Sequence, residues 1–224
     1  MLFELKKSFP DYYRYYGRRI AKRLSPSIND IFIKNFKNFS LDEEILKNLN
    51  SDKYQSLTLN SKFKKNIIEI GFGDGKHLFG LAQANKDTHF IGCEVFINGL
   101  GKALKKIVEN NLTNISLCGL NCLYLLENIK DSSIDKIFII NPDPWEKKRH
   151  FKRRLINKEF IALMYKKIKN GGKVIVTTDS SSYFSSILEI IKSEEIDFEE
   201  TVQKLLDKGD ELYDISKYQK KGIE

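Results

Sequence analysis

The chain has 224 residues and a formal net charge of +8, with 41% hydrophobic and 12% aromatic residues. This length and apolar content predict one domain, or one domain with an appendage, and exclude a chain too polar to build a core. No apolar stretch approaches the roughly 20 residues of a membrane-spanning helix, and residues 1–10 lack the pattern of a signal peptide, so no membrane partner is expected.

The positive charge is concentrated in two segments. Residues 1–38 contain nine Lys/Arg and three acids, and residues 147–154 contain six Lys/Arg and no acid. Each segment therefore carries +6, which leaves −4 for the remainder of the +8 chain. This localised excess predicts a polyanionic partner such as nucleic acid, and solvated lysine-rich faces are the alternative explanation.

Residues 1–40 are expected to form a basic, tyrosine-rich arm in front of a main domain at residues 41–224. Four tyrosines at positions 12 to 16 interleave with arginines and lysines, a mixture that stacks on bases and pairs with phosphates. Docking of the tyrosines onto the main domain is an equally weighted alternative. Ser25-Pro26 is expected to start a short helix, and Asp42–Leu49 is expected to form another.

From residue 66 onward, short apolar runs alternate with segments of helical spacing. The predicted strands are Asn66–Ile70, Thr88–Val95, Asn114–Cys118, Ile134–Ile140 and Lys173–Thr178. The predicted helices are Lys76–Ala84, Asn98–Glu109, Asn121–Ile129, Leu155–Ile168 and Tyr183–Lys192. Residues 170–172 (NGG) are interpreted as the C-cap of the fourth helix. Repeated βα units predict an α/β fold with a doubly wound, mostly parallel sheet.

The cysteines and histidines do not form a recognisable metal set. Cys93, Cys118 and Cys122 are odd in number and lie in or beside strand-like runs, which favours buried thiols in a reducing cytosol over a disulfide framework. His77 and His89 are interpreted as structural. We therefore expect neither a metal nor a disulfide.

Residues 69–75 (EIGFGDG) follow the first predicted strand and open a helix, and their glycines permit a sharp turn close to a ligand. The third glycine comes two residues after the second, whereas the dinucleotide fingerprint spaces these glycines by three. Glu69 can pair with a cationic group such as the amine of a methionine moiety. Glu94, 19 residues after Gly75, can accept both hydroxyl hydrogens of a ribose. These features favour S-adenosylmethionine as the ligand, with NAD as the alternative.

Residues 142–145 (PDPW) separate the apolar run Ile134–Ile140 from the basic residues 147–154. Ligands of open α/β sheets bind outside the carboxyl ends of strands, so Asp143 beside an aromatic residue is expected to belong to a site. The alternatives are that Asp143 only builds a tight turn and that Trp145 is a buried structural residue.

These motifs together resemble the bacterial tRNA (guanine-N7)-methyltransferases, and the resemblance extends over nearly the whole chain. The segments that carry it are residues 16–19 (YGRR), 24–26 (LSP), 69–73 (EIGFG), 91–94 (IGCE), 142–154 (PDPWEKKRHFKRR) and 178–179 (TD). The resemblance implies a Rossmann-like S-adenosylmethionine-dependent methyltransferase fold. It also implies a cytoplasmic enzyme that methylates N7 of a guanine in the tRNA variable loop.

The resemblance also implies roles for individual residues. Cofactor-binding roles are implied for Glu69, Gly71, Gly73, Glu94 and Asn121. Asp143 is implied as the catalytic residue, which would orient the guanine and stabilise its developing positive charge without removing a proton, because N7 has a free lone pair. Substrate or tRNA contacts are implied for Lys147, Arg149, Lys152, Arg153, Arg154, Asp179, Ser216, Lys217, Tyr218 and Gln219.

Three features depart from the family pattern. Asn121 stands where the family usually has Asp, and Gln219 stands where it usually has Glu. Family members usually continue into a last sheet strand, whereas this chain stops at Glu224, so either the chain is a truncated piece or that strand is absent. Two functions remain as alternatives to methylation of tRNA at guanine N7. One is an S-adenosylmethionine-dependent methyltransferase that acts on another substrate, and the other is a catalytically weakened tRNA-binding relative.

Overall fold

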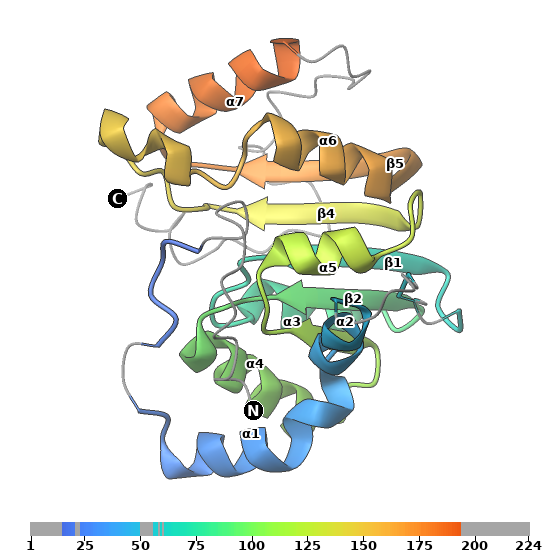
Figure 1. Ribbon diagram of the computed structural model, residues 1–224. Helices are drawn as coiled ribbons and strands as arrows, with labels where there is room; N and C mark the ends of the chain where they lie inside the picture. The colour runs from blue at the N-terminus through green and yellow to red at the C-terminus, as the bar shows by residue number, and fades with distance from the viewer. Residues whose placement is uncertain (1–14, 21–22, 50–55, 58, 60, 194–224) are drawn as a thin grey trace.

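The computed structural model describes residues 15–20, 23–49, 56–57, 59 and 61–193. Its strands are β1 (Lys65–Ile70), β2 (Thr88–Cys93), β3 (Ile115–Cys118), β4 (Ile134–Ile140) and β5 (Ile168–Thr177). They form a parallel sheet with the order β3-β2-β1-β4-β5 (Figure 1). This confirms the predicted doubly wound α/β fold. The strand order reverses between β1 and β4, which is where such sheets bind ligands at their carboxyl edge.

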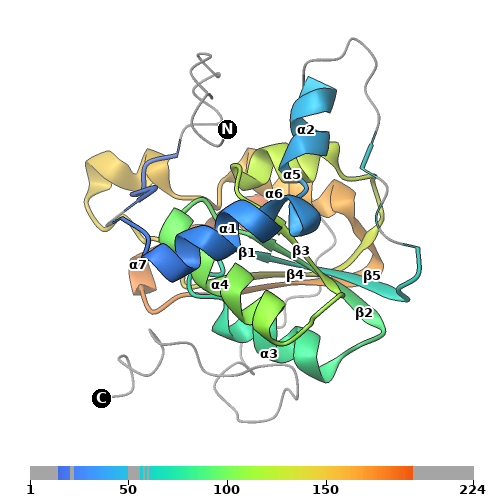
Figure 2. The same cartoon turned by 90° about the horizontal axis from the view of Figure 1, so that it is seen from below.

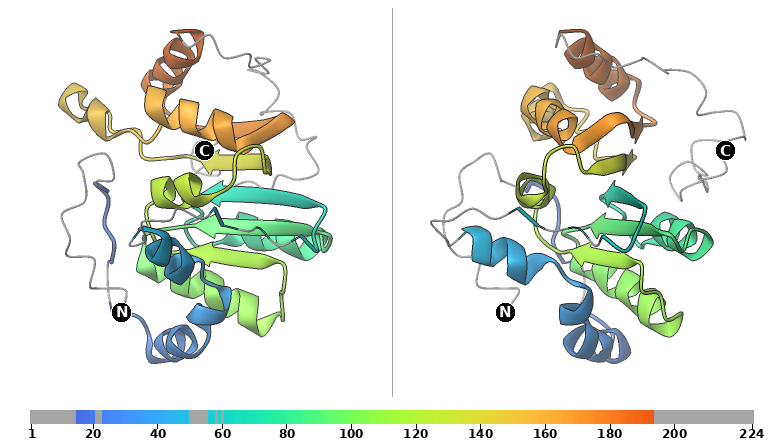
Figure 3. Two further views of the ribbon diagram at one scale, coloured as in Figure 1. Left: turned by 45° about the vertical axis from the view of Figure 1, so that its right-hand side comes forward. Right: turned by 90° about the vertical axis from the view of Figure 1, so that its right-hand side faces the viewer.

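Helices cover both faces of the sheet (Figures 2 and 3). The helices are α1 (Pro26–Phe39), α2 (Asp42–Leu49), α3 (Lys76–Ala84), α4 (Ile97–Glu109), α5 (Cys122–Asn128), α6 (Lys158–Lys167) and α7 (Ser181–Ser193), with a 3-10 helix η2 (Lys148–Arg153). Apolar side chains of α2, α5, α6 and α7 pack into one core, and those of α1, α3 and α4 pack into the other. No helix in the described part of the chain is long and apolar enough to cross a membrane.

Alternation along the central strands assigns each side chain to one of these two cores. In β1, Ile68 belongs to the core with α5, and Ile67 belongs to the core with α3 and α4. Glu69, two residues after Ile67, therefore points to the α3 side, as does Phe138 of β4. The face of the sheet to which a side chain points therefore determines which helix a polar residue in a central strand can contact.

Two predicted boundaries near the carboxyl-terminal end of the described chain differ from the structure. Helix α6 begins only at Lys158, because the Asn157 side chain accepts the Phe160 N–H at 2.9 Å and caps it. Residues 170–172 do not cap this helix. They lie in an irregular stretch of β5, where Gly171 has a φ of 74° and the pairing with β4 shifts register.

Helix α1 is longer than the short helix expected after Ser25-Pro26. It spans 14 residues, and the Ser25 hydroxyl accepts the Ile28 N–H at 3.4 Å at its start. A Cβ at Gly101 of α4 would lie 2.7 Å from Cγ2 of Ile28, so this glycine lets the two helices approach closely. Packing against α4, which local propensity does not reveal, extends the helix.

Candidate active site

The glycine loop, residues 71–75, connects β1 to α3 at the carboxyl edge of the sheet. Gly71 and Gly73 have φ values of 73° and 60°, in the left-handed region that favours glycine. A Cβ at either position would meet no atom within 4 Å, so open space lies beside both residues. The Gly71 N–H donates to the Cys93 carbonyl at 2.8 Å, which fixes the loop to the end of β2. The loop therefore has room for a ligand against its backbone.

Glu94 directly follows β2 and is 9% exposed. Its Oε2 accepts the Gly73 N–H at 2.9 Å and its Oε1 accepts the Phe96 N–H at 2.8 Å. Burial raises the pKa of Glu94, these backbone hydrogen bonds lower it, and the negative charge of Asp143 raises it. The influence of Asp143 on Glu94 indicates that the two predicted acids lie in one region. A third backbone hydrogen bond, with Val95, also lowers this pKa, and the carboxylate keeps acceptor capacity for a ligand hydroxyl.

Glu69 is held from the α3 side. Its Oε2 lies 2.9 Å from Nδ1 of His77, and no described residue donates a hydrogen bond to its Oε1. Burial raises the pKa of Glu69, and the hydrogen bond with His77 lowers it. The sequence indicates Glu69 but not this partner, because His77 lies outside the recognised motifs.

Asn121 lies in the loop of residues 119–121, directly after β3. Its Oδ1 accepts the Leu123 N–H at 3.0 Å and caps α5. The Gly119 N–H donates to Oδ1 of Asp42 at 2.9 Å. The loop is therefore anchored at the edge that carries the glycine loop and Glu94, and one anchor comes from α2.

Asp42 is a buried acid that no sequence motif indicates. It is the first residue of α2 and is 6% exposed. Its Oδ2 has no hydrogen-bond partner among the described residues. Burial raises the pKa of Asp42 to about 6, although hydrogen bonds from Gly119, Cys118 and Ser40 lower it. Such an incompletely satisfied carboxylate costs folding free energy when it is ionised.

Asp42→Asn is expected to stabilise the protein above pH 6 while keeping an acceptor for Gly119. The pKa is about 6 in the native state and ordinarily 3.8, so between these values the native state keeps a proton that the unfolded chain releases. The resulting stability is present below pH 3.8 and is lost as the pH rises through about 6. The loss amounts to about 3 kcal/mol. Urea unfolding from pH 4 to pH 8 should show the variant overtaking the wild type over this window, and a gap independent of pH would contradict the assignment.

The loop of residues 141–146, which we call the Asp143 loop, follows β4 and carries Asp143, which is exposed. Asn141 and Trp145, on either side of Asp143, each have a φ of 47°, which is uncommon for non-glycine residues. The Asn141 N–H donates to the Thr177 carbonyl at 3.0 Å, and the Thr177 hydroxyl donates to Oδ1 of Asn141 at 3.1 Å. These contacts with the end of β5 fix the loop where Asp143 leaves the sheet.

The far side of the Asp143 loop is held by a buried cation. Arg154 is 5% exposed, donates from Nε to the Pro144 carbonyl at 2.8 Å, and donates from Nη2 to Oγ of Ser182 at 3.0 Å. The Glu146 carboxylate accepts hydrogen bonds from the hydroxyls of Ser180 and Ser182, at 2.5 and 2.9 Å. The sequence predicts a tRNA contact for Arg154, but its burial and these bonds assign it to positioning the loop.

Four exposed cations remain beside the loop and form what we call the cationic ledge: Lys147, Lys148, Arg149 and Lys152. Apart from Lys147, they lie on η2. Asp179 is exposed after the end of β5, at the same edge of the sheet. The predicted substrate residues Ser216, Lys217, Tyr218 and Gln219 lie outside the described residues, as does the end of the chain.

The described part of the arm, residues 15–20, runs along the carboxyl edge of the sheet, on the left in Figure 1. The Ile97 N–H at the start of α4 donates to the Arg19 carbonyl at 2.8 Å. The Arg153 guanidinium lies over the Tyr16 ring, 5.2 Å from its centroid. The arm therefore contacts both the glycine-loop side and the basic side of the site.

Tyr15 lies within electrostatic reach of both predicted acids. Burial raises the pKa of its hydroxyl to about 12, with further contributions from the charges of Glu94 and Asp143. Its side chain is nevertheless 42% exposed. From the sequence, stacking on bases and docking onto the main domain are equally weighted roles for this tyrosine. Its position next to the two predicted acids is compatible with both.

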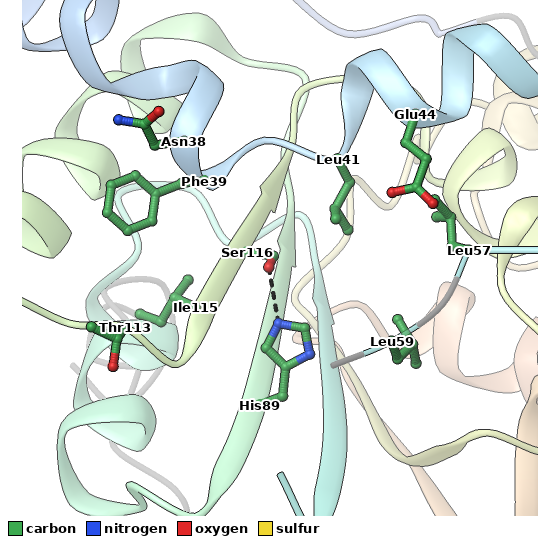
Figure 4. Close-up of a pocket in the computed structure, with 10 residues that line it drawn as sticks. All are labelled: Asn38, Phe39, Leu41, Glu44, Leu57, Leu59, His89, Thr113, Ile115 and Ser116. Carbon is green, nitrogen blue, oxygen red and sulfur yellow. Dashed lines mark hydrogen bonds between the residues drawn. The ribbon is translucent and has the colours of Figure 1, made fainter. Parts of the chain in front are cut away.

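A cavity of about 400 Å³ lies away from this edge (Figure 4). Its lining includes His89 and Ile115, at the amino-terminal ends of β2 and β3. It also includes Phe39, the last residue of α1, and Leu41, between α1 and α2. His89 is hydrogen-bonded to Ser116 at 2.9 Å in this lining. The opposite end of the strands carries all the described predicted site residues, so this cavity is not part of the candidate active site.

Comparison with known proteins gives consistent matches. A family model described as "Putative methyltransferase" matches residues 64–224. A tRNA (guanine-N(7)-)-methyltransferase of Wolbachia pipientis wMel is 35% identical over 170 residues, which cover 76% of this chain and 72% of that protein. Another, of Methylobacillus flagellatus, is 38% identical over 158 residues, which cover 70% of this chain and 66% of that protein.

Longer proteins also match. A bifunctional methyltransferase of Rickettsia felis is 34% identical over 215 residues, which cover 94% of this chain but 37% of that protein. Across the five matched Rickettsia proteins of this description, the matched region spans 23–38% of their length.

Proposed function

Since this chain belongs to the family of putative methyltransferases that includes the tRNA (guanine-N7)-methyltransferases, we propose that it methylates tRNA. The methyl group of S-adenosyl-L-methionine is transferred to N7 of a guanine, which the motif resemblance implies to lie in the variable loop. One observation carries the proposal: the glycine loop, Glu94, Asn121 and Asp143 all lie where adjacent parallel strands end, next to the cationic ledge.

The residues at this edge fit S-adenosylmethionine. Gly71 and Gly73 leave open space beside their backbone, as close approach of a ligand requires. Glu94 is buried and pre-oriented by backbone N–H groups that include those of Gly73 and Phe96, and its remaining acceptor capacity suits the ribose hydroxyls. Glu69 retains an oxygen without a hydrogen bond from a described residue for the amine of the methionine moiety, and Asn121 lies where the adenine is expected.

The chemical step requires positioning more than proton transfer. Guanine N7 carries a free lone pair, so no general base is needed. S-adenosylmethionine, when bound, supplies an electrophilic methyl group. The chain would have to hold N7 in line with this group at a near-attack distance of about 3–3.5 Å. Asp143 accepts hydrogen bonds from N1–H and the exocyclic amine of guanine, and its charge stabilises the positive charge that develops on the purine.

The cationic ledge supplies the contacts to the RNA backbone. Lys147, Arg149 and Lys152 pair with tRNA phosphates, which sets orientation and adds little base selectivity. The target guanine leaves its stack to reach Asp143, at a cost of a few kcal/mol that the phosphate contacts offset. Exposed Asp179 is available to the same substrate.

A methyl-transfer assay tests the function. The full chain is incubated with methyl-labelled S-adenosylmethionine and unfractionated tRNA, and the digested RNA is analysed by mass spectrometry. We expect label on N7-methylguanine. Cofactor binding without transfer to tRNA would refute tRNA as the substrate and favour a methyltransferase with another substrate. Tight tRNA binding without cofactor binding would favour the weakened relative.

A further inference from the structure

Glu69 and His77 form a buried pair that methyl transfer by itself does not explain. Their side chains are 4% and 6% exposed, and Oε2 of Glu69 lies 2.9 Å from Nδ1 of His77. The edge of the Phe138 ring packs against the imidazole, with ring centroids 4.9 Å apart. Burying two titratable groups in an apolar core is costly unless they satisfy each other, so the pair needs a reason.

The pair joins the two ends of the glycine loop. Glu69 lies two residues before Gly71, and His77 lies two residues after Gly75. β1 is hydrogen-bonded to β2 and β4 on its two sides, so the backbone of Glu69 is fixed. A hydrogen bond from this strand to the first turn of α3 restricts a loop whose glycines would otherwise sample many conformations.

His77 also influences the charge of Glu69. Burial raises the pKa of this carboxyl, the hydrogen bond and charge of His77 lower it, and Asp74 in the loop raises it. His77 is therefore the contact that favours the ionised carboxylate, and Oε1 is left without a hydrogen bond from a described residue. An ionised, singly satisfied carboxylate beside the glycine loop is suited to bind a cationic group.

We propose that His77 is a positioning residue of the cofactor site, which holds Glu69 as a carboxylate so that its Oε1 pairs with the ammonium of the methionine moiety. The inference rests on the proposed S-adenosylmethionine site and adds a residue to it that lies outside the family motifs. It concerns only the amino-acid end of the cofactor, because the ribose is assigned to Glu94.

Two probe ligands separate this role from a general structural one. S-adenosylhomocysteine carries the amine, and 5′-methylthioadenosine is a closely related nucleoside without the amino-acid portion. Calorimetry on His77→Leu is expected to show about 10- to 100-fold weaker binding of S-adenosylhomocysteine, the range for losing a hydrogen bond to a charged group. Binding of 5′-methylthioadenosine should change by less than about twofold, and His77→Asn, which restores an N–H donor, should recover most of the affinity.

His89→Leu is the matched control, because it removes another buried histidine, one hydrogen-bonded to Ser116 and Asn66 at the amino-terminal end of β2. We expect it to leave the affinity ratio of the two probes unchanged. If His77→Leu does not fold, Glu69→Gln serves instead, since it keeps an acceptor for His77 but removes the charge. It should lose S-adenosylhomocysteine selectively.

Equal losses for both probes in His77→Leu, or none for either, would overturn the role of His77. Failure of the wild type to bind S-adenosylhomocysteine would overturn the cofactor site and the inference together. Normal probe selectivity without methylation of tRNA would refute the proposed substrate alone, so the two failures are distinguishable.

Discussion

Asp143→Ala is expected to reduce the single-turnover rate of guanine methylation by about 10²–10³-fold, the usual effect of removing one preorganised electrostatic group. The acid is exposed at the end of β4, in a loop fixed by Asn141 and Thr177, so its loss should leave the fold intact. Since the cationic ledge supplies the phosphate contacts, tRNA affinity should fall by less than about threefold. Rapid-quench kinetics with labelled cofactor and filter binding of tRNA measure the two quantities.

Glu109→Ala provides the control for this experiment. Glu109 is also exposed, but it ends α4 and therefore lies near the amino-terminal edge of the sheet, away from Asp143. Its removal should leave both the rate and the tRNA affinity unchanged. An Asp143→Ala enzyme as fast as the control would refute the catalytic role, and a parallel loss of tRNA affinity and rate would reduce Asp143 to a binding residue.

Arg154→Met is expected to lower the free energy of unfolding by about 3 kcal/mol, because two part-buried hydrogen bonds from a charged donor are lost. The guanidinium donates to Pro144 and Ser182, and it lies 3.8 and 4.7 Å from the ring centroids of Phe151 and Tyr183. Urea unfolding followed by circular dichroism measures the change. A loss below about 1 kcal/mol would show that the arginine does not support the Asp143 loop.

Lys152→Met is the natural companion variant, since it removes an exposed cation two positions away from Arg154. It should change stability by less than about 0.5 kcal/mol. Its tRNA affinity should fall, and the salt dependence of binding should decrease by about one phosphate contact. Two neighbouring cations would thus have different roles: Arg154 would stabilise the fold, and Lys152 would bind RNA. Unchanged tRNA affinity would show that Lys152 does not contact tRNA.

The sheet was predictable because its signals are local. Each predicted strand is a short apolar run followed by a helical segment, and this alternation alone determines a parallel sheet. Residues 170–172 were misassigned because an Asn-Gly-Gly sequence suits a helix end and an irregular strand equally. Only the pairing of β5 with β4 distinguishes these two structures.

The position of Glu94, Asn121 and Asp143 at one edge of the sheet was predictable, because each follows a strand of a parallel sheet. A role that depends on a distant partner was not predictable. Arg154 looks like its basic neighbours until Ser182, 28 residues later, is found against it. Asp42 is similar, because its partner Gly119 is 77 residues away. Spacing and composition carry no information about such contacts.

The left-handed turn at Trp145 has an optical consequence. The chain contains one tryptophan, so its indole emission comes entirely from a residue two positions after Asp143. The ring meets His150 edge-on with centroids 5.8 Å apart and lies under Arg153 at 5.0 Å. Any rearrangement of these neighbours alters the surroundings of the fluorophore. Tryptophan fluorescence therefore reports on the candidate active site, in real time and without an attached dye.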